Sequence, residues 1–197
     1  TGNGSAAGLS NVFLTAGPVT LAGSAQFALS RQTVDVDTDG NGSADLLAAT
    51  LDGIALTVTG VTVDVAGVAQ VTASGQLALA RVTPAGVGAT VRYSALKMGN
   101  VTVSGSGSGT NFGLSGSVTI ASLNTNSTTV ANRLDWTTAF DLDGDGSADV
   151  LDPGAALAAP VTGLAIDFPA TLQLSVAGGI TGNGSAAGLS NVFLTAG

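Results

Sequence analysis

Two short segments of the chain are rich in aspartate and glycine. The first, DVDTDGNGSAD, runs from Asp35 to Asp45, and the second, DLDGDGSADVLD, runs from Asp141 to Asp152. Both contain the tetrapeptide GSAD, and alignment on it places the acidic residues at alternate positions. Alternate residues of a tightly turning loop can point their carboxylates at one centre, where they repel each other unless a cation lies between them. The spacing therefore predicts two cation sites.

The pattern within each loop favours calcium as the cofactor. Calcium prefers six to eight hard oxygen ligands, and a glycine at the sixth loop position permits the sharp turn. Gly42 and Gly146 occupy that position. The candidate ligands in the first loop are Asp37, Asp39, Asn41, Ser43 and Asp45. Those in the second loop are Asp141, Asp143, Asp145, Ser147, Asp149 and Asp152.

Both loops resemble the calcium loops of EF-hand and dockerin modules, although the helices that flank such loops are not evident. The resemblance implies the ligand roles given above, with a backbone carbonyl offered at the serine position. The first loop has Ala48 where the second has Asp152, and Asp35 or Asp52 could compensate. The alternative is that the Asp-Gly and Asn-Gly pairs form plain solvated turns between strands. Bound calcium is expected to be structural rather than catalytic.

The composition argues against several classes of function. The 197 residues include no cysteine, no histidine and no glutamate, so general acid–base chemistry is poorly supplied. We therefore expect no enzyme and no small-molecule substrate. The net charge is −8 and the five basic residues are scattered, which argues against binding to nucleic acid. No apolar run is long enough to span a bilayer as a helix, so membrane insertion is not expected.

The elements that would position the two loops are predicted to be strands. Apolar and polar residues alternate along most of the chain, as in Ile54–Val58 and, after a phase slip at Gly60, in Val61–Val65. Glycine or proline stands at most of the breaks, where turns, bulges or phase slips are expected. These breaks are at Gly17, Pro18, Gly23, Gly60, Gly67, Gly75, Gly105, Gly116 and Pro169. Only short helices are conceivable, at Ser43–Leu51 and Ala155–Ala159.

The two ends of the chain are identical. Residues 1–17 and residues 181–197 both read TGNGSAAGLSNVFLTAG. We interpret residues 1–180 as one full tandem repeat unit and residues 181–197 as the start of the next identical repeat. Four related pieces inside the unit suggest roughly four β sub-repeats. They are Gly23–Arg31, Ser74–Arg81, Ser115–Leu123 and Pro169–Ala177.

These patterns predict an all-β, elongated architecture. The first choice is a β-solenoid-like or stacked-strand repeat array in which adjacent units bury each other's edges. The alternative is a series of tandem β-sandwich domains with calcium at their junctions. The glycine-marked phase slips favour the array, and no linker recurs once per period.

The chain as a whole resembles the giant repetitive surface and fibre proteins of bacteria. The resemblance lies in the exact long repeat, the acidic loops, and strand-like segments such as ALTVTGVTVDVAG and VRYSALKMGNVTVSGSG. It implies secretion to the extracellular cell surface and a place in a calcium-stabilised fibre, sheath or adhesin stalk, with copies of itself as partners. A second possibility is an adhesive module that binds a ligand or ice. A β-helix enzyme is the third.

Overall fold

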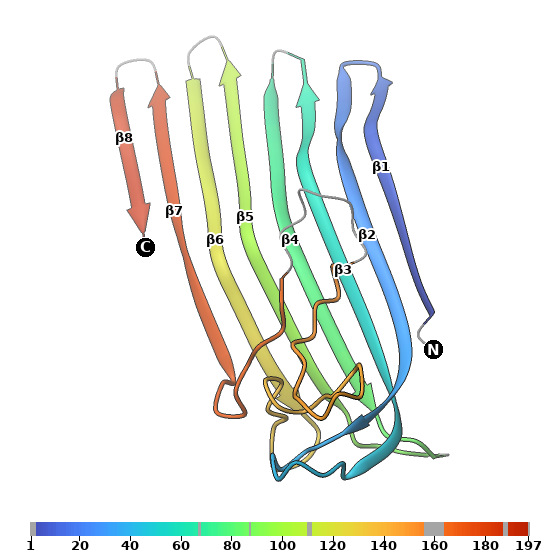
Figure 1. Cartoon of the computed structure of the whole chain (residues 1–197). Helices are drawn as coiled ribbons and strands as arrows, with labels where there is room; N and C mark the ends of the chain where they lie inside the picture. Colours follow the sequence, from blue (N-terminus) through green and yellow to red (C-terminus); the bar gives the residue numbers. More distant parts are fainter. Residues whose placement is uncertain are drawn as a thin grey trace.

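The computed structural model shows one open β-sheet (Figure 1). It describes residues 3–66, 68–86, 88–109, 112–155, 164–186 and 189–196. Eight strands lie side by side in chain order, each antiparallel to the next, which confirms the all-β prediction. Their bounds are β1 Asn3–Ala16, β2 Val19–Val36, β3 Leu46–Val65, β4 Ala69–Thr83, β5 Tyr93–Gly109, β6 Phe112–Thr128, β7 Leu174–Ala186 and β8 Leu189–Ala196.

All described strands belong to this single sheet, so the described part of the chain does not contain the two facing sheets of a sandwich. It contains no helical residue, and hence no helix that could cross a membrane. The short helix expected at Ser43–Leu51 is wrong, because β3 begins at Leu46 and its edge pairing with β2 outweighs the weak local helix signal. The other helix candidate, Ala155–Ala159, lies outside the described residues after Ala155.

The connections at the two ends of the sheet differ in length. At one end, short connections join β1 to β2, β3 to β4, β5 to β6 and β7 to β8, and the first of them is a turn at Gly17 and Pro18. At the opposite end, the connections 37–45, 84–92 and 129–173 are long (Figure 1). Both acidic segments fall within these long connections. We call the two ends the short-turn end and the loop end.

Several of the predicted phase slips are real interruptions of the strand register. The pairing shifts at Gly23 in β2, at Gly60 in β3 and at Gly75 in β4. In contrast, Gly105 and Gly116 pair with each other in an unbroken register, so the expectation of a break there is wrong. Further shifts complete a row across the sheet, which we call the bulge row. Its members are Gly23, Gly60, Gly75, Asn100, Ala121 and Gly178.

Two of the glycines in the bulge row allow a close approach of neighbouring backbones. A Cβ atom on Gly23 would lie 2.6 Å from the Cα atom of Val61, and one on Gly75 would lie 3.0 Å from the Cα atom of Val101. The residues that precede these valines are both left-handed, with φ of 56° at position 60 and 54° at Asn100. The same bulge is thus built twice, which gives the weak internal repeat a physical meaning.

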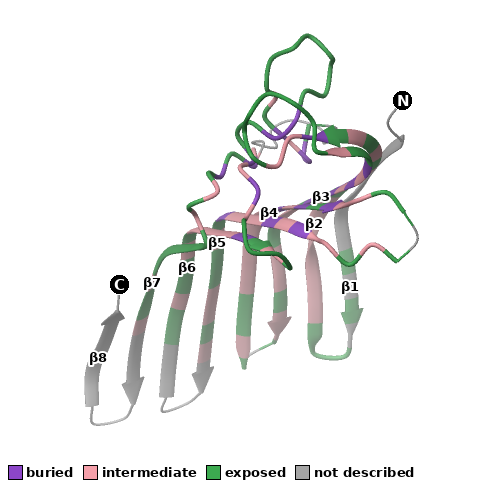
Figure 2. Cartoon of the chain, turned by 90° about the horizontal axis from the view of Figure 1, so that it is seen from below, coloured by how far each residue is buried: buried purple, intermediate pink, exposed green. Residues whose placement is uncertain are grey.

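The hydrophobic core lies at the loop end, on one face of the sheet only. It is formed where the connection between β6 and β7 folds back over β2–β6, and we call residues 129–155 and 164–173 of this connection the cover segment (Figure 2). Its fully buried side chains include Trp136, Phe140 and Ile166. They pack on small and medium side chains of the sheet: Val36, Ala49, Leu51, Ala78, Ala80, Val82, Tyr93 and Ala95.

A buried asparagine fixes the cover segment to the sheet. The side chain of Asn126, on β6, is 1% exposed. Its Nδ2 donates to the carbonyl oxygen of Leu134 at 2.9 Å, and its Oδ1 accepts from Nε1 of Trp136 at 3.0 Å. A buried polar group of this kind stabilises the fold because its hydrogen bonds are made. The ring of Trp136 also packs against that of Phe140, the residue before the second acidic loop, with ring centroids 5.7 Å apart.

The opposite face of the sheet has no cover among the described residues. Strand β4 has no bulge of its own, so its odd-numbered residues, such as Leu77 and Leu79, all point to this face, while Ala78 and Ala80 point to the core. The register places many exposed large side chains on the same side as Leu77. They are Val19, Phe27, Leu29, Ile54, Leu56, Val63, Val71, Val103, Val118, Leu174, Val176 and Ile180. We call this side the open apolar face.

Charge is confined almost entirely to the loop end. The chain has 18 charged side chains. Asp64 is the only one on the short-turn side of the bulge row. Two ion pairs lie on the loop-end side of the bulge row, Arg31 with Asp52 and Lys97 with Asp167. Apart from Asp64, the short-turn half of the sheet is therefore built of neutral residues.

The bulge row generates a stability prediction. Gly23→Ala places a methyl group against the Val61 backbone, which cannot move without breaking the pairing of β2 with β3, so we expect a loss of about 2 kcal/mol or more in the free energy of unfolding. Gly105→Ala is the matched control, because its nearest contacts would be at 3.6 Å. We expect this control to stay within about 0.5 kcal/mol of the wild type. Urea unfolding followed by circular dichroism measures both, and equal losses would contradict the close-approach argument.

Candidate metal centre

The two acidic loops lie next to each other at the loop end of the sheet. The first loop joins β2 to β3, and the second belongs to the cover segment. The backbone N–H of Asp37 donates to the carbonyl oxygen of Ala139 at 3.0 Å, so one loop is tied to the residue two positions before Asp141, where the other begins. The two loops therefore share one edge of the hydrophobic core.

Each loop starts and closes in the same way. Val36 and Phe140, both fully buried, directly precede Asp37 and Asp141. The N–H of Asp45 donates to the carbonyl oxygen of Val36 at 2.9 Å, and the N–H of Asp149 donates to that of Phe140 at 2.7 Å. A buried apolar residue thus anchors the neck of each loop while the acidic residues stay at the surface.

Three carboxylates converge in each loop. One oxygen atom from each of three aspartates lies within 4.8 Å of the other two. The groups are Asp37, Asp39 and Asp45 in the first loop, and Asp141, Asp143 and Asp149 in the second. These six residues are all predicted ligands, and the structure brings them together as two equivalent triads that could hold a metal ion.

Backbone N–H groups hold the first aspartate of each triad in place. Asp37 accepts from Gly40 and Gly42, each at 2.7 Å, through different carboxylate oxygens. Asp141 accepts in the same way from Gly144 at 2.7 Å and Gly146 at 2.9 Å. All four glycines have left-handed φ values between 76° and 85°, which side chains other than glycine rarely adopt. The repeated glycines of the two loops therefore have a direct geometric function.

The remaining predicted ligands have other contacts. Asn41 and Asp145 accept the N–H of Ser43 and Ser147 at 2.8 and 2.7 Å, so these four residues shape the turn beside the triads. Asp152 accepts the N–H of Gly154 at 2.8 Å and is not part of the converging group.

The two aspartates considered as substitutes for Ala48 bind elsewhere. Asp35 accepts the N–H of Ala48 at 2.8 Å, and Asp52 pairs with Arg31. Neither belongs to the first triad, so the twelfth position of the first loop has no carboxylate replacement among these residues.

Local hydrogen bonds favour the ionised form of two of these carboxylates. Slight burial acts to raise the pKa of Asp37, but four backbone N–H groups, led by those of Gly42 and Gly40, outweigh it and lower the pKa below its usual value. The pKa of Asp45 is lowered mainly by the side chain and N–H of Thr38, which donate at 2.7 and 2.8 Å. Both groups are thus ready to act as anionic ligands at neutral pH.

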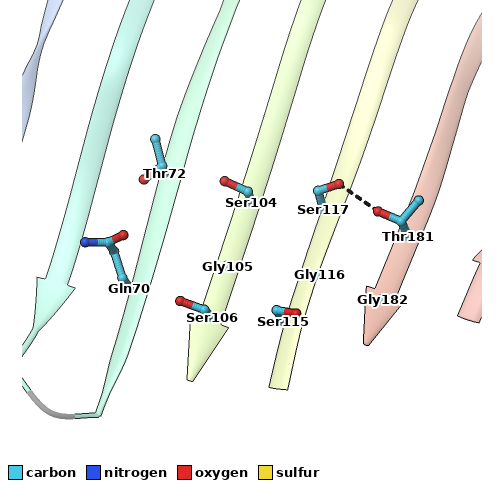
Figure 3. A pocket seen from close by; sticks show the side chains of 10 residues that line it. All are labelled: Gln70, Thr72, Ser104, Gly105, Ser106, Ser115, Gly116, Ser117, Thr181 and Gly182. Atoms are coloured by element: carbon cyan, nitrogen blue, oxygen red, sulfur yellow. Dashed lines mark hydrogen bonds between the residues drawn. The ribbon is translucent and has the colours of Figure 1, made fainter. Parts of the chain in front are cut away.

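A second candidate site is a shallow hollow on the covered face, on the short-turn side of the bulge row. Figure 3 shows hydroxyl side chains from neighbouring strands that point into it. The strand pairing aligns one row across five strands: Thr62, Thr72, Ser104, Ser117 and Thr181. Two pairs in the row are hydrogen-bonded, Thr62 with Thr72 at 3.0 Å and Ser117 with Thr181 at 2.9 Å.

The sequence patterns did not predict this row, which we call the hydroxyl row. Its members are far apart in the chain, and only the register between strands brings them into line. Polar residues at matching positions of successive predicted hairpins would have been the available signal.

Lysine is not available as a free catalytic group. Lys97 Nζ donates to the carbonyl oxygen of Ala165 at 2.8 Å and to Asp167 at 2.9 Å, and it lies over the ring of Phe168. These contacts bind β5 to the cover segment. The side chain therefore has a structural position.

Comparison with known proteins identifies no relative. No family model, no curated protein and no solved structure matches the chain.

The lowered pKa values of Asp37 and Asp45 predict acid sensitivity. A carboxyl group whose pKa is lower in the folded state stabilises the fold above its unfolded pKa of about 3.9, and this contribution is lost as the pH falls through the folded value. In EDTA, we expect the free energy of unfolding to fall as the pH drops below about 4. Asp45→Asn should make this decline shallower in urea unfolding measured between neutral and acidic pH. An unchanged pH profile in the variant would contradict the assignment.

Proposed function

We propose that this chain is a structural unit of an extracellular tandem array, which forms a bacterial surface fibre, sheath or adhesin stalk stabilised by calcium. The observation that carries the proposal is the identity of residues 1–17 and 181–197. Near-identical repeats at a fixed spacing serve length and self-association, whereas catalysis does not require a copied centre. We propose no enzymatic role, and copies of the same unit are the partners.

The shape of the sheet supports association between copies. Six strands, β2–β7, contribute to the open apolar face, and strand spacings give it an area of about 1,000 Å². Stable interfaces bury about 800 Å² per partner, and monomers rarely expose an apolar patch this large. Figure 2 shows the sheet extending well beyond the cover segment. Because the strands follow one another in a meander, we favour a stacked-strand array over a solenoid.

The acidic triads support calcium as the cation. Their ligands are carboxylate oxygens only, which suits a hard cation such as calcium better than zinc or copper. Each triad lies within a single loop at the edge of the core, so one ion would stabilise the connection between β2 and β3 and the other would stabilise the cover segment. With free calcium at about one hundred times the dissociation constant, each site would add about 2.7 kcal/mol to stability.

Calcium dependence gives a direct test with a matched pair of variants. We expect Asp149→Asn to lower the melting temperature in calcium, because one triad loses a negative ligand, but to leave it equal or higher in EDTA, where the carboxylates only repel. Asp152→Asn is the control, since Asp152 lies outside the triad. Differential scanning fluorimetry with and without calcium reports both. Equal losses in the two conditions would assign the loops to ordinary turns.

Self-association gives the second test. In electron microscopy of a protein with several consecutive units, we expect filaments with a regular repeat, which loosen in EDTA. Leu56→Lys, on the open apolar face, should weaken lateral association, while Thr72→Lys, on the other face, should not. Separate particles on a flexible string, unchanged by EDTA, would speak against a calcium-stabilised fibre.

The hydroxyl row favours one alternative function, an adhesive module that binds a flat polar ligand, a glycan or ice. Hydroxyl groups repeated at the strand spacing of about 4.8 Å form a regular polar surface. The variants above separate the two functions, because an adhesive role would be lost with Thr72→Lys and kept with Leu56→Lys.

A further inference from the structure

The open apolar face ends abruptly at a row of charged side chains. On β2–β4, every residue of this face is apolar from the short-turn end as far as Leu29, Ile54 and Leu79. The next residues on the same side are paired with each other in one row across the three strands, and they are Arg31, Asp52 and Arg81. The face is therefore a continuous apolar surface of about 1,000 Å² with a charged border at one end, and its area matches what one partner buries in a stable interface.

The side chains of this face differ in size between the two halves of the sheet. One row of paired residues near the short-turn end has large side chains on β2–β4 and glycine on β5–β7. Its members are Leu21, Val63, Val71, Gly105, Gly116 and Gly182. In the adjoining row, the small residues belong to the first strands instead, because Gly23 lies against Val61 and Ala73 is paired with Val103.

We propose that two copies of the unit pack open apolar face against open apolar face, as a two-sheet sandwich with a twofold axis that runs along the strands between β4 and β5. This inference deepens the proposed association between copies and rests on it. The axis divides the eight strands into two equal halves, so β4 faces the partner's β5, β3 faces the partner's β6 and β2 faces the partner's β7. Because both copies use the same face, the contact closes as a dimer.

This axis places large side chains opposite glycine. Val71 faces the partner's Gly105 and Val63 faces the partner's Gly116, and each contact occurs twice in the dimer. An axis displaced by one strand, between β3 and β4, would instead place Val63 opposite the partner's Val71. Two large side chains would then hold the sheets apart there, and the glycines would face empty space, whereas protein interiors are closely packed. The size pattern therefore selects the central axis.

The charged border selects the direction of the axis. With the axis along the strands, the borders of both copies lie together at one open end of the sandwich, where Asp52 and Arg81 stay hydrated. An axis across the strands would place these charges over apolar residues of the partner's short-turn half, at a high cost in desolvation. The cover segments lie on the outer surfaces. Two sheets about 10 Å apart therefore separate the acidic loops of the two copies, and salt screens charges over about 8 Å.

Complementary charge variants test which strands face each other. Leu56 on β3 and Leu123 on β6 lie in one row of the face, three strand spacings or about 14 Å apart within a chain. In the sandwich, Leu56 faces the partner's Leu123. Leu56→Lys or Leu123→Asp alone buries two unpaired charges per dimer, so we expect each to raise the dimer dissociation constant at least about a hundredfold. An equimolar mixture of the two should associate at least about tenfold more tightly than either variant alone, because each heterodimer brings opposite charges together.

Leu77→Asp is the matched control. Leu77 is paired with Leu56 within one chain, but in the sandwich it faces the partner's Met98. A mixture of Leu56→Lys with Leu77→Asp should therefore associate as weakly as either variant alone. Sedimentation equilibrium measures the dissociation constants, and native mass spectrometry distinguishes heterodimers from homodimers. Recovery with Leu77→Asp, or no recovery with Leu123→Asp, would overturn the proposed axis.

The unsubstituted chain keeps the inference testable if a variant does not fold. We expect it to sediment as a dimer at about 100 µM, well above the micromolar dissociation constants of weak interfaces of this size. A monomer at this concentration would overturn the inference, and a monomer that binds phosphatidylcholine vesicles would assign the face to a lipid surface instead. Failure here is distinct from failure of the proposed function: filaments of a multi-unit protein whose single units do not dimerise would leave the array and remove only the sandwich.

Discussion

The packing of the cover segment on the small side chains of the sheet is the interaction on which the rest of the structure depends. A single open sheet has no core of its own, and only at the loop end do Trp136 and Phe140 supply one. Alanines such as Ala78 and Ala80 let these rings approach the strands closely. The same contact places the two acidic loops side by side and gives each a buried neck. A metal ion in either triad would therefore act directly on the part of the fold that holds the sheet together.

The bulge row divides the molecule into two parts with different physical characters. On the loop side, one face is buried and the charged residues gather around it. On the short-turn side, neither face is covered by described residues, and the sheet is held by strand pairing between residues that are all neutral except Asp64. This division is consistent with a unit that is completed by contact with others, because the stable part carries the loops and the incomplete part carries the surfaces that remain to be buried.

Much of the fold could be predicted because the signals were local. Alternation marked the strands, and the phase slip at Gly60 identified a real bulge. The predicted break at Gly116 is wrong because the sequence alone does not distinguish a glycine within a regular strand from a glycine at a bulge. The acidic triads followed from spacing within each loop, whereas the hydroxyl row depends on where distant segments meet. The single sheet itself was not foreseen, since repetition indicates that units associate but not through which edge or face.

The segregation of charge has a consequence for how such molecules meet in solution. Two copies that approach with their loop ends facing each other experience repulsion between like charges, over a screening distance of about 8 Å at physiological ionic strength. Copies that approach with their short-turn ends encounter no comparable barrier, because Asp64 is the only charge there. The molecule thus has an asymmetric charge distribution, acidic at the loop end and nearly neutral at the short-turn end. Ionic strength alone can change the preferred orientation of encounter without altering any contact within the fold.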